Sequence, residues 1–222
     1  RSFFPEAVSY NRFVELESRA FFPLMFFLNF RAFGRCTGIT FVDSTMIPVC
    51  HNLRRYVNKV FKDIATDGKG AIAGVMASNF IWPVMTEGGI AFVLTGANVS
   101  DRDSKAFDVL AQRLYGKLFA DKGYISQNLF DALFEDGIQL VTGLRVNMKN
   151  KLMPFYDKMM LRKRHNIETI NEEHGPNSTL ATQVCHHIMN LISALVTYCF
   201  FDNKPAALVG YSIEDTRQLN LF

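Results

Sequence analysis

Two segments of this sequence share one design, in which a short apolar run typical of a buried strand is followed by an aspartate and polar residues. The first segment is Gly38–Thr45, with the sequence GITFVDST, and the second is Lys117–Tyr124, with the sequence KLFADKGY. The residue types favour strands that end at Asp43 and Asp121. An aspartate that only begins a turn gives the same pattern, so the first segment taken alone does not separate a structural role from a functional one.

The segments around these runs predict the elements of a mixed α/β sheet. Apolar residues at spacings of three and four, with Ser9 as N-cap, predict a helix over residues 11–29. Two apolar runs, 71–85 and 90–95, flank a glycine-containing turn and predict an antiparallel hairpin. Further helices are expected at 103–115, from an N-cap at Ser126 to before 137, at 158–173 and at 182–201, with a further strand at 138–142. This order predicts parallel strands joined to a hairpin and flanked by helices.

Length and composition favour one globular domain. The chain has 222 residues, with 49% hydrophobic and 20% charged residues, which is enough for a sizeable core and is not typical of a disordered chain. We expect an N-terminal helical segment at 1–36 packed on the core, a main domain at 37–201 that contains both aspartate segments, and a C-terminal tail at 202–222.

The sequence predicts an intracellular protein without a membrane partner. Its longest apolar stretch, Ile188–Phe201, contains polar residues and is shorter than the roughly 20 residues that span a bilayer. No export signal is recognisable at the start of the chain. The cysteines show no close pair of the kind that binds zinc, which suits a reducing cytoplasm. They are Cys36, Cys50, Cys185 and Cys199.

Basic residues gather next to the candidate acids, although the net charge of +3 is small. The first basic patch follows the first strand run and consists of Arg54, Arg55, Lys59 and Lys62. The second basic patch has one acid, Asp157, among seven basic residues, which are Arg145, Lys149, Lys151, Lys158, Arg162, Lys163 and Arg164. Either patch alone could be a solvated face, but two patches beside acids favour binding to DNA phosphates.

A third acid, Glu168, falls in the predicted helix at 158–173. Two strand-end aspartates and a helical glutamate offer three carboxylates at one edge of the sheet. Carboxylate oxygens are preferred ligands of Mg²⁺, and paired ions support phosphodiester chemistry. The spacing alone is weak evidence, because α/β proteins often carry acids at strand ends.

The sequence resembles the DDE-type transposases of bacterial insertion sequences, which have a ribonuclease-H-like catalytic domain. The resemblance covers residues 4–201 approximately and rests on four segments, which are FVDST at 41–45, NVSDR at 98–102, ADKGY at 120–124 and LRKRHNIETIN at 161–171. It implies that Asp43, Asp121 and Glu168 are catalytic and bind two Mg²⁺ ions, with Mn²⁺ as a substitute. It also implies cleavage at the element ends followed by strand transfer into target DNA.

The resemblance also implies partners and a location. They are double-stranded DNA, a homo-oligomer assembled on that DNA, and the nucleoid region of the bacterial cytoplasm. Arg164, four residues before Glu168, matches the family's arginine on that helix and is expected to face DNA. The basic residues expected to bind DNA are Arg54, Arg55, Lys122, Lys149, Lys151, Arg162 and Arg164.

The sequence departs from the family pattern at several positions. Asn79 and Ile81 replace a lysine and a histidine of relatives, Gly175 replaces a lysine, and Pro83 is expected to damage its strand. The usual N-terminal DNA-binding region is not recognisable. We therefore expect a chain that binds metal but cleaves and joins DNA poorly. The alternatives are a decayed or repurposed DNA-binding protein that keeps the fold without catalysis, and a structural interaction domain.

Two further sets of residues are assigned structural roles. Cys185, His186 and His187 could suggest a metal site, but adjacent helical residues point in different directions and core or capping roles are favoured. Trp82 and Tyr124 could stack on a DNA base, but a buried ring is the more frequent outcome.

Overall fold

The computed structural model describes residues 6–50, 66–67, 76–85, 88–89, 91–96, 99–100, 103–145, 147–149, 152–164 and 184–200. The helices are α1 (Tyr10–Phe27), which continues into the π-helical turn η1 (Leu28–Ala32), α2 (Ser104–Ala111), the 3₁₀ turn η3 (Lys122–Tyr124), α3 (Gln127–Glu135), α4 (Phe155–Lys163) and α6 (Val184–Cys199). The strands are β1 (Ile39–Cys50), β2 (Thr66–Asp67), β3 (Met76–Met85), β4 (Gly88–Gly89), β5 (Val93–Gly96), β6 (Gly116–Ala120) and β7 (Ile138–Thr142).

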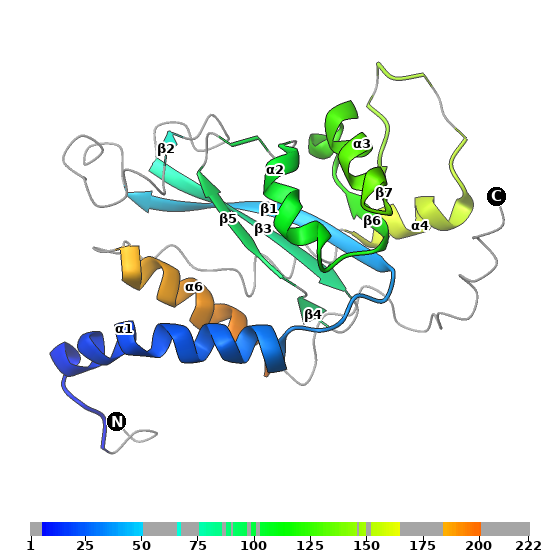
Figure 1. Cartoon of the computed structure of the whole chain (residues 1–222). Coiled ribbons are helices and arrows are strands. Elements are labelled where there is room, and N and C mark those ends of the chain that lie inside the picture. Colours follow the sequence, from blue (N-terminus) through cyan, green and yellow to red (C-terminus); the bar gives the residue numbers. More distant parts are fainter. Residues whose placement is uncertain are drawn as a thin grey trace.

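All described strands belong to one mixed sheet in the order β2-β3-β1-β6-β7, with β4 and β5 also paired to β3 (Figure 1). β3 runs antiparallel to β1, β2, β4 and β5, whereas β6 is parallel to both β1 and β7. An antiparallel part thus joins a parallel part at β1. This arrangement confirms the predicted ribonuclease-H-like sheet.

Helices cover both faces of the sheet, as Figure 1 shows. On one face, Phe41 and Phe119 pack with side chains of η1, α4 and α6. On the other face, Val42 and Leu118 pack with side chains of α2 and α3. Because side chains alternate along a strand, the residues of β1 with odd numbers share the face of Phe41. Asp43 therefore lies on the face that α4 and α6 cover.

The prediction that the first strand ends at Asp43 is wrong. β1 continues to Cys50, and its pairing with β3 runs through Asp43 opposite Trp82. What ends near this point is the pairing with β6, whose last register pair with β1 is Phe41 with Phe119. The polar residues that suggested a turn are accommodated in the strand because one neighbouring strand has stopped.

The prediction that Pro83 damages its strand is also wrong. β3 is continuous over ten residues, and Pro83 pairs in register with Val42 of β1. Along its other edge, β3 pairs with β5 up to Ile81 and with β4 from Val84. Pro83 falls between these two pairings, where a missing backbone donor costs little.

Several other predictions are confirmed. Ser9 caps α1 and Ser126 caps α3 through their side chains. Trp82 and Tyr124 are buried in the core, which excludes stacking of either ring on a DNA base. Trp82 contacts Tyr198 edge-to-face, and burial, together with the nearby Cys199, raises the pKa of Tyr198 to about 12. Tyr198, like Trp82, is therefore an uncharged residue of the core at neutral pH.

The last helices are only partly comparable with the prediction. The helix expected at 158–173 begins earlier, at Phe155, and is described to Lys163. The expected apolar helix at 182–201 corresponds to α6. None of the helices that the structure describes has the length and apolarity that crossing a membrane requires.

A close approach of two glycines sets β6 beside β1. Gly116 has φ +81°, and a Cβ at this position would lie 2.4 Å from the Gly38 carbonyl oxygen. The next residue, Lys117, donates its backbone N–H to the same oxygen at 2.8 Å. Only glycine fits both the conformation and the space.

We expect Gly116→Ala to lower the free energy of unfolding by about 2 kcal/mol, from left-handed strain and the clash together. The matched control is Gly137→Ala, since Gly137 has φ +75° and no atom of the described residues lies within 4 Å of an added Cβ. Strain alone should cost it about 1 kcal/mol. Urea denaturation of the two variants measures the difference. Equal losses would mean that the approach to Gly38 adjusts without cost.

Candidate active site

Asp43 lies on β1, and Asp121 directly follows β6, the parallel neighbour of β1, at the corresponding position. Phe41 pairs with Phe119 in the parallel register, and each aspartate is two residues further along. Phe41 and Phe119 both belong to the core under α4 and α6, so the alternation of side chains places both carboxylates on that face. β6 ends at Ala120, which leaves Asp121 at the rim.

One guanidinium group contacts both carboxylates. Arg164, the residue directly after α4, places Nη1 3.4 Å from Asp43 Oδ1 and Nη2 3.8 Å from Asp121 Oδ1. The arginine side chain is only 13% exposed, and the Asp43 and Asp121 side chains are 20% and 53% exposed. The two acids are therefore directed at one point, which a positive charge already occupies.

Asp121 is not used to cap the turn that it begins. The 3₁₀ turn η3 starts directly after Asp121, but the aspartate side chain makes no capping hydrogen bond. By contrast, the Asp103 carboxylate caps α2 by accepting from the Lys105 backbone N–H at 3.1 Å. A turn-forming role thus explains Asp103 but not the side chain of Asp121.

A second ion pair fixes α4 against the strand that carries Asp121. Lys117 Nζ on β6 lies 2.8 Å from Asp157 Oδ1 on α4, with side-chain exposures of 19% and 5%. Met160, on the same helix, is fully buried in the core. These contacts hold the helix whose end delivers Arg164 to the carboxylates.

The two aspartates fit a divalent metal ion as part of its ligand set. Their oxygens converge on a cationic group, and hard cations such as Mg²⁺ take carboxylate ligands. Asp43 and Asp121 would hold the ion, with Glu168 as the third ligand that the resemblance implies. Glu168 lies outside the described residues, and within them no group of three or more potential ligand side chains forms a metal site.

The basic residues predicted to bind DNA are placed as follows. Lys122 begins η3 beside Asp121 and is exposed. Its carbonyl oxygen accepts a hydrogen bond from Arg145 Nη2 at 2.9 Å. Lys149 and Arg162 are also exposed, whereas Arg164 is directed at the carboxylates. Arg54, Arg55 and Lys151 lie outside the described residues.

The departures from the family pattern have different structural meanings. Ile81 is buried in the core under α2 and α3, so position 81 supports the fold and does not face DNA. Asn79 lies on β3 opposite Met46, but its side chain is not described. Gly175 lies outside the described residues. The side chains of Cys185, His186 and His187, which are assigned structural roles from the sequence, are not described either.

Sequence reasoning missed the partners that organise the site. Arg164 was expected to face DNA, and nothing in its spacing indicated contact with two carboxylates. The pair of Lys117 and Asp157 was also missed. The available signal was that Asp157 is the one acid in the second basic patch, because an isolated acid among basic residues often has a specific cationic partner.

The sheet order and the paired acids define the class of this protein as a ribonuclease-H-like domain with a carboxylate site. The family described as "Transposase DDE domain" matches residues 33–187. The chain belongs to this family of DDE transposase domains. The match covers most of the chain, including both aspartates and the position of Glu168.

Comparisons with individual proteins are more distant. No curated protein matches this chain. A similar solved structure is that of the "Mos1 transposase paired-end complex with left transposon end", at 11% sequence identity and a TM-score of 0.28. The similarity covers 61% of this chain and 43% of that one, so the chain spans less than half of the matched protein.

Replacing Arg164 with glutamine should strengthen metal binding, because the guanidinium and a metal ion compete for the same carboxylates. We expect the dissociation constant for Mn²⁺ to fall about fivefold, which corresponds to ~1 kcal/mol for one partly exposed ion pair. Arg162→Gln is the matched control, since Arg162 lies two residues earlier in α4 and is exposed, and it should leave the constant unchanged. Isothermal titration calorimetry measures both. Weaker Mn²⁺ binding by Arg164→Gln would instead mean that the arginine organises the acids.

Proposed function

We propose that this chain is the catalytic domain of a DNA transposase that cleaves phosphodiester bonds at the ends of an element and joins the freed 3′ hydroxyl to target DNA. The catalytic residues in this proposal are Asp43, Asp121 and Glu168. The observation that carries the proposal is the convergence of Asp43 and Asp121 on Arg164 in a member of the DDE transposase family. An insertion-sequence origin is part of the same proposal.

The residues of this chain hold and orient the reacting groups. Bound Mg²⁺ or Mn²⁺ ions would activate the attacking water or hydroxyl and stabilise the departing oxygen. Asp43 lies inside β1, and the pairing of β1 with β3 continues on both sides of it. The position of its carboxylate is therefore fixed by the backbone of the sheet. Asp121 is half exposed at the rim, where a DNA phosphate can approach. The rate of this reaction depends mainly on how precisely the reacting groups are positioned.

The exposed basic residues around the acids support DNA as the substrate. Lys122 adjoins Asp121, and its side chain lies over the loop after β7, since a Cβ at Gly143 would come within 3.2 Å of Lys122 Cε. Arg162, two residues before Arg164, and Lys149 are also exposed. Contacts of this kind bind phosphates without reading bases, so affinity should fall steeply with salt and vary little with sequence.

The rate of the reaction is expected to be low. Pro83 and Ile81 have structural roles in this fold, so neither is a reason to expect a low rate. Gly175 still lacks the basic side chain that relatives place near the catalytic glutamate. A poorly held scissile phosphate slows phosphoryl transfer by about two orders of magnitude, whereas the carboxylates can still bind metal.

The test is divalent-metal-dependent nicking of a supercoiled plasmid by the purified full chain, with a thermal-stability measurement in parallel. We expect Mg²⁺ or Mn²⁺ to raise the melting temperature and slow nicking to accompany it. If metal stabilises the chain and the chain binds DNA, but no nicking occurs, the alternative holds, which is a DNA-binding protein without catalysis. No response to either ion would overturn the metal site.

A further inference from the structure

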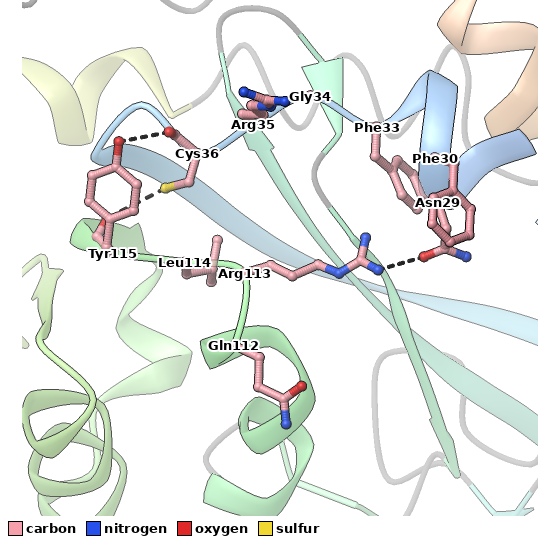
Figure 2. Close-up of a pocket in the computed structure, with 10 residues that line it drawn as sticks. All are labelled: Asn29, Phe30, Phe33, Gly34, Arg35, Cys36, Gln112, Arg113, Leu114 and Tyr115. Carbon is pink, nitrogen blue, oxygen red and sulfur yellow. Dashed lines mark hydrogen bonds between the residues drawn. The ribbon is translucent and has the colours of Figure 1, made fainter. Parts of the chain in front are cut away.

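A pocket of about 650 Å³ lies at the end of the parallel strands away from the acids. Figure 2 shows its walls, which are the segment from Asn29 to Cys36 and the connection from Gln112 to Tyr115 that leads into β6. Tyr115 precedes β6 and Asp121 follows it, a separation of six residues or about 20 Å along a strand. The pocket is therefore distinct from the carboxylate site.

The pocket is held in shape by hydrogen bonds between its two walls. Tyr115 Oη donates to the Cys36 carbonyl oxygen at 2.8 Å, and Arg113 Nη2 donates to Asn29 Oδ1 at 2.7 Å (Figure 2). Asn29 Nδ2 in turn donates to the Met25 carbonyl oxygen at 2.8 Å. A ligand would enter a site that needs little reorganisation, which favours binding.

The pocket is positively charged. Arg35 and Arg113 line it, both are exposed, and no acidic residue is among the lining residues that the structure describes. Among the residues that the structure describes, neither arginine forms an ion pair, and the partner of Arg113 is the neutral amide of Asn29. Guanidinium groups keep further N–H donors that match phosphate oxygens.

Aromatic rings lie beside this charge. Phe30 and Tyr115 line the pocket with side-chain surfaces that are largely open, since the two residues are 69% and 56% exposed. Phe33 adds a partly buried ring. Exposed aromatic rings next to arginines form a surface on which nucleobases stack. Gln112 supplies an amide that can hydrogen-bond a base edge.

We propose that this pocket binds one nucleotide, with its phosphate on Arg35 and Arg113 and its base against Phe30 or Tyr115. The volume lies within the range of roughly 300–1,000 Å³ typical of small-ligand sites. A concave site of this size accepts a single unit and not the convex backbone of a duplex. The nucleotide comes either from an unpaired stretch of DNA or from a free mononucleotide, which share this chemistry. The preference for DNA as the source rests on the proposed function.

The experiment measures binding of a fluorescein-labelled thymidine hexamer to the full chain by fluorescence anisotropy. Competitors are the unlabelled hexamer, thymidine monophosphate, inorganic phosphate and a blunt duplex. The variants are Arg35→Gln with Arg113→Gln, and Phe30→Ala, all at exposed positions. The matched control is Arg19→Gln, because Arg19 is exposed on α1 and does not line the pocket.

We expect the double arginine variant and Phe30→Ala each to weaken hexamer binding at least about tenfold, the effect of one lost stacking or charge-assisted contact, while Arg19→Gln matches the wild type. If thymidine monophosphate competes at concentrations comparable with the unlabelled hexamer, the ligand of the pocket is a free nucleotide. If only the unlabelled hexamer competes, the ligand is unpaired DNA. Either result supports the site.

Three results would overturn the proposal. They are unchanged hexamer binding in the pocket variants, competition by inorganic phosphate equal to that by the monophosphate, and competition by the blunt duplex equal to that by the unlabelled hexamer. Stabilisation by Mn²⁺ should match the wild type in the Arg35, Arg113 and Phe30 variants, because the pocket lies at the opposite end of β6 from Asp121. Failure of the pocket and failure of the carboxylate site therefore give separate signatures.

Discussion

Asp121→Asn is expected to abolish the stabilisation of this chain by Mn²⁺ and to reduce metal-dependent nicking at least about a hundredfold. Asparagine keeps the size of the side chain but removes the charge that a divalent ion requires. Asp121 is half exposed and its contact with Arg164 is long, at 3.8 Å, so the fold without metal should lose less than about 1 kcal/mol. The effect is therefore on the site and not on folding.

Asp43→Asn should show the same loss of metal response with a larger cost to the fold, because its side chain is 20% exposed and lies 3.4 Å from Arg164. The control is Asp108→Asn, which removes one negative charge from an exposed position on α2. Thermal melting with and without Mn²⁺, together with plasmid nicking, measures all three variants. A metal response that survives in both Asp43→Asn and Asp121→Asn would place the ion elsewhere.

The convergence of the two acids could be predicted from local sequence because strands impose simple geometry. Two apolar runs that each lead into an aspartate suggest neighbouring strands, and the parallel register of Phe41 with Phe119 brings the aspartates level. Alternation then places both on one face. The helix caps at Ser9 and Ser126 could also be predicted from local sequence. Each cap depends only on the serine side chain and a backbone N–H three residues later.

The errors have a common cause, which is that pairing partners come from distant parts of the chain. Asp43, Ser44 and Thr45 suggest a strand end, but β3 pairs with β1 beyond them and keeps the strand intact. Pro83 is tolerated because of where the β4 and β5 pairings stop. Arg164 reaches Asp43 across 121 positions of sequence. No local pattern contains this information.

Lys117→Met is expected to lower the free energy of unfolding by about 3 kcal/mol. The change leaves the carboxylate of Asp157 without its partner at 2.8 Å, in a side chain that is only 5% exposed, and an unpaired buried charge is costly. A smaller part of the loss comes from Tyr156, whose ring centroid lies 6.0 Å from Lys117 Nζ. Urea denaturation measures the change.

The double variant Lys117→Met with Asp157→Leu separates the cost of an unpaired charge from the value of the ion pair. Replacing a buried pair by apolar residues is often neutral, so we expect stability within about 1 kcal/mol of the wild type. α4 would then be held by its apolar contacts, Met160 above all, and the Mn²⁺ response at Asp43 and Asp121 should persist. If the double variant regains stability but loses the Mn²⁺ response, the ion pair has a second role. It would set the position of α4, and with it Arg164, relative to the strand that carries Asp121.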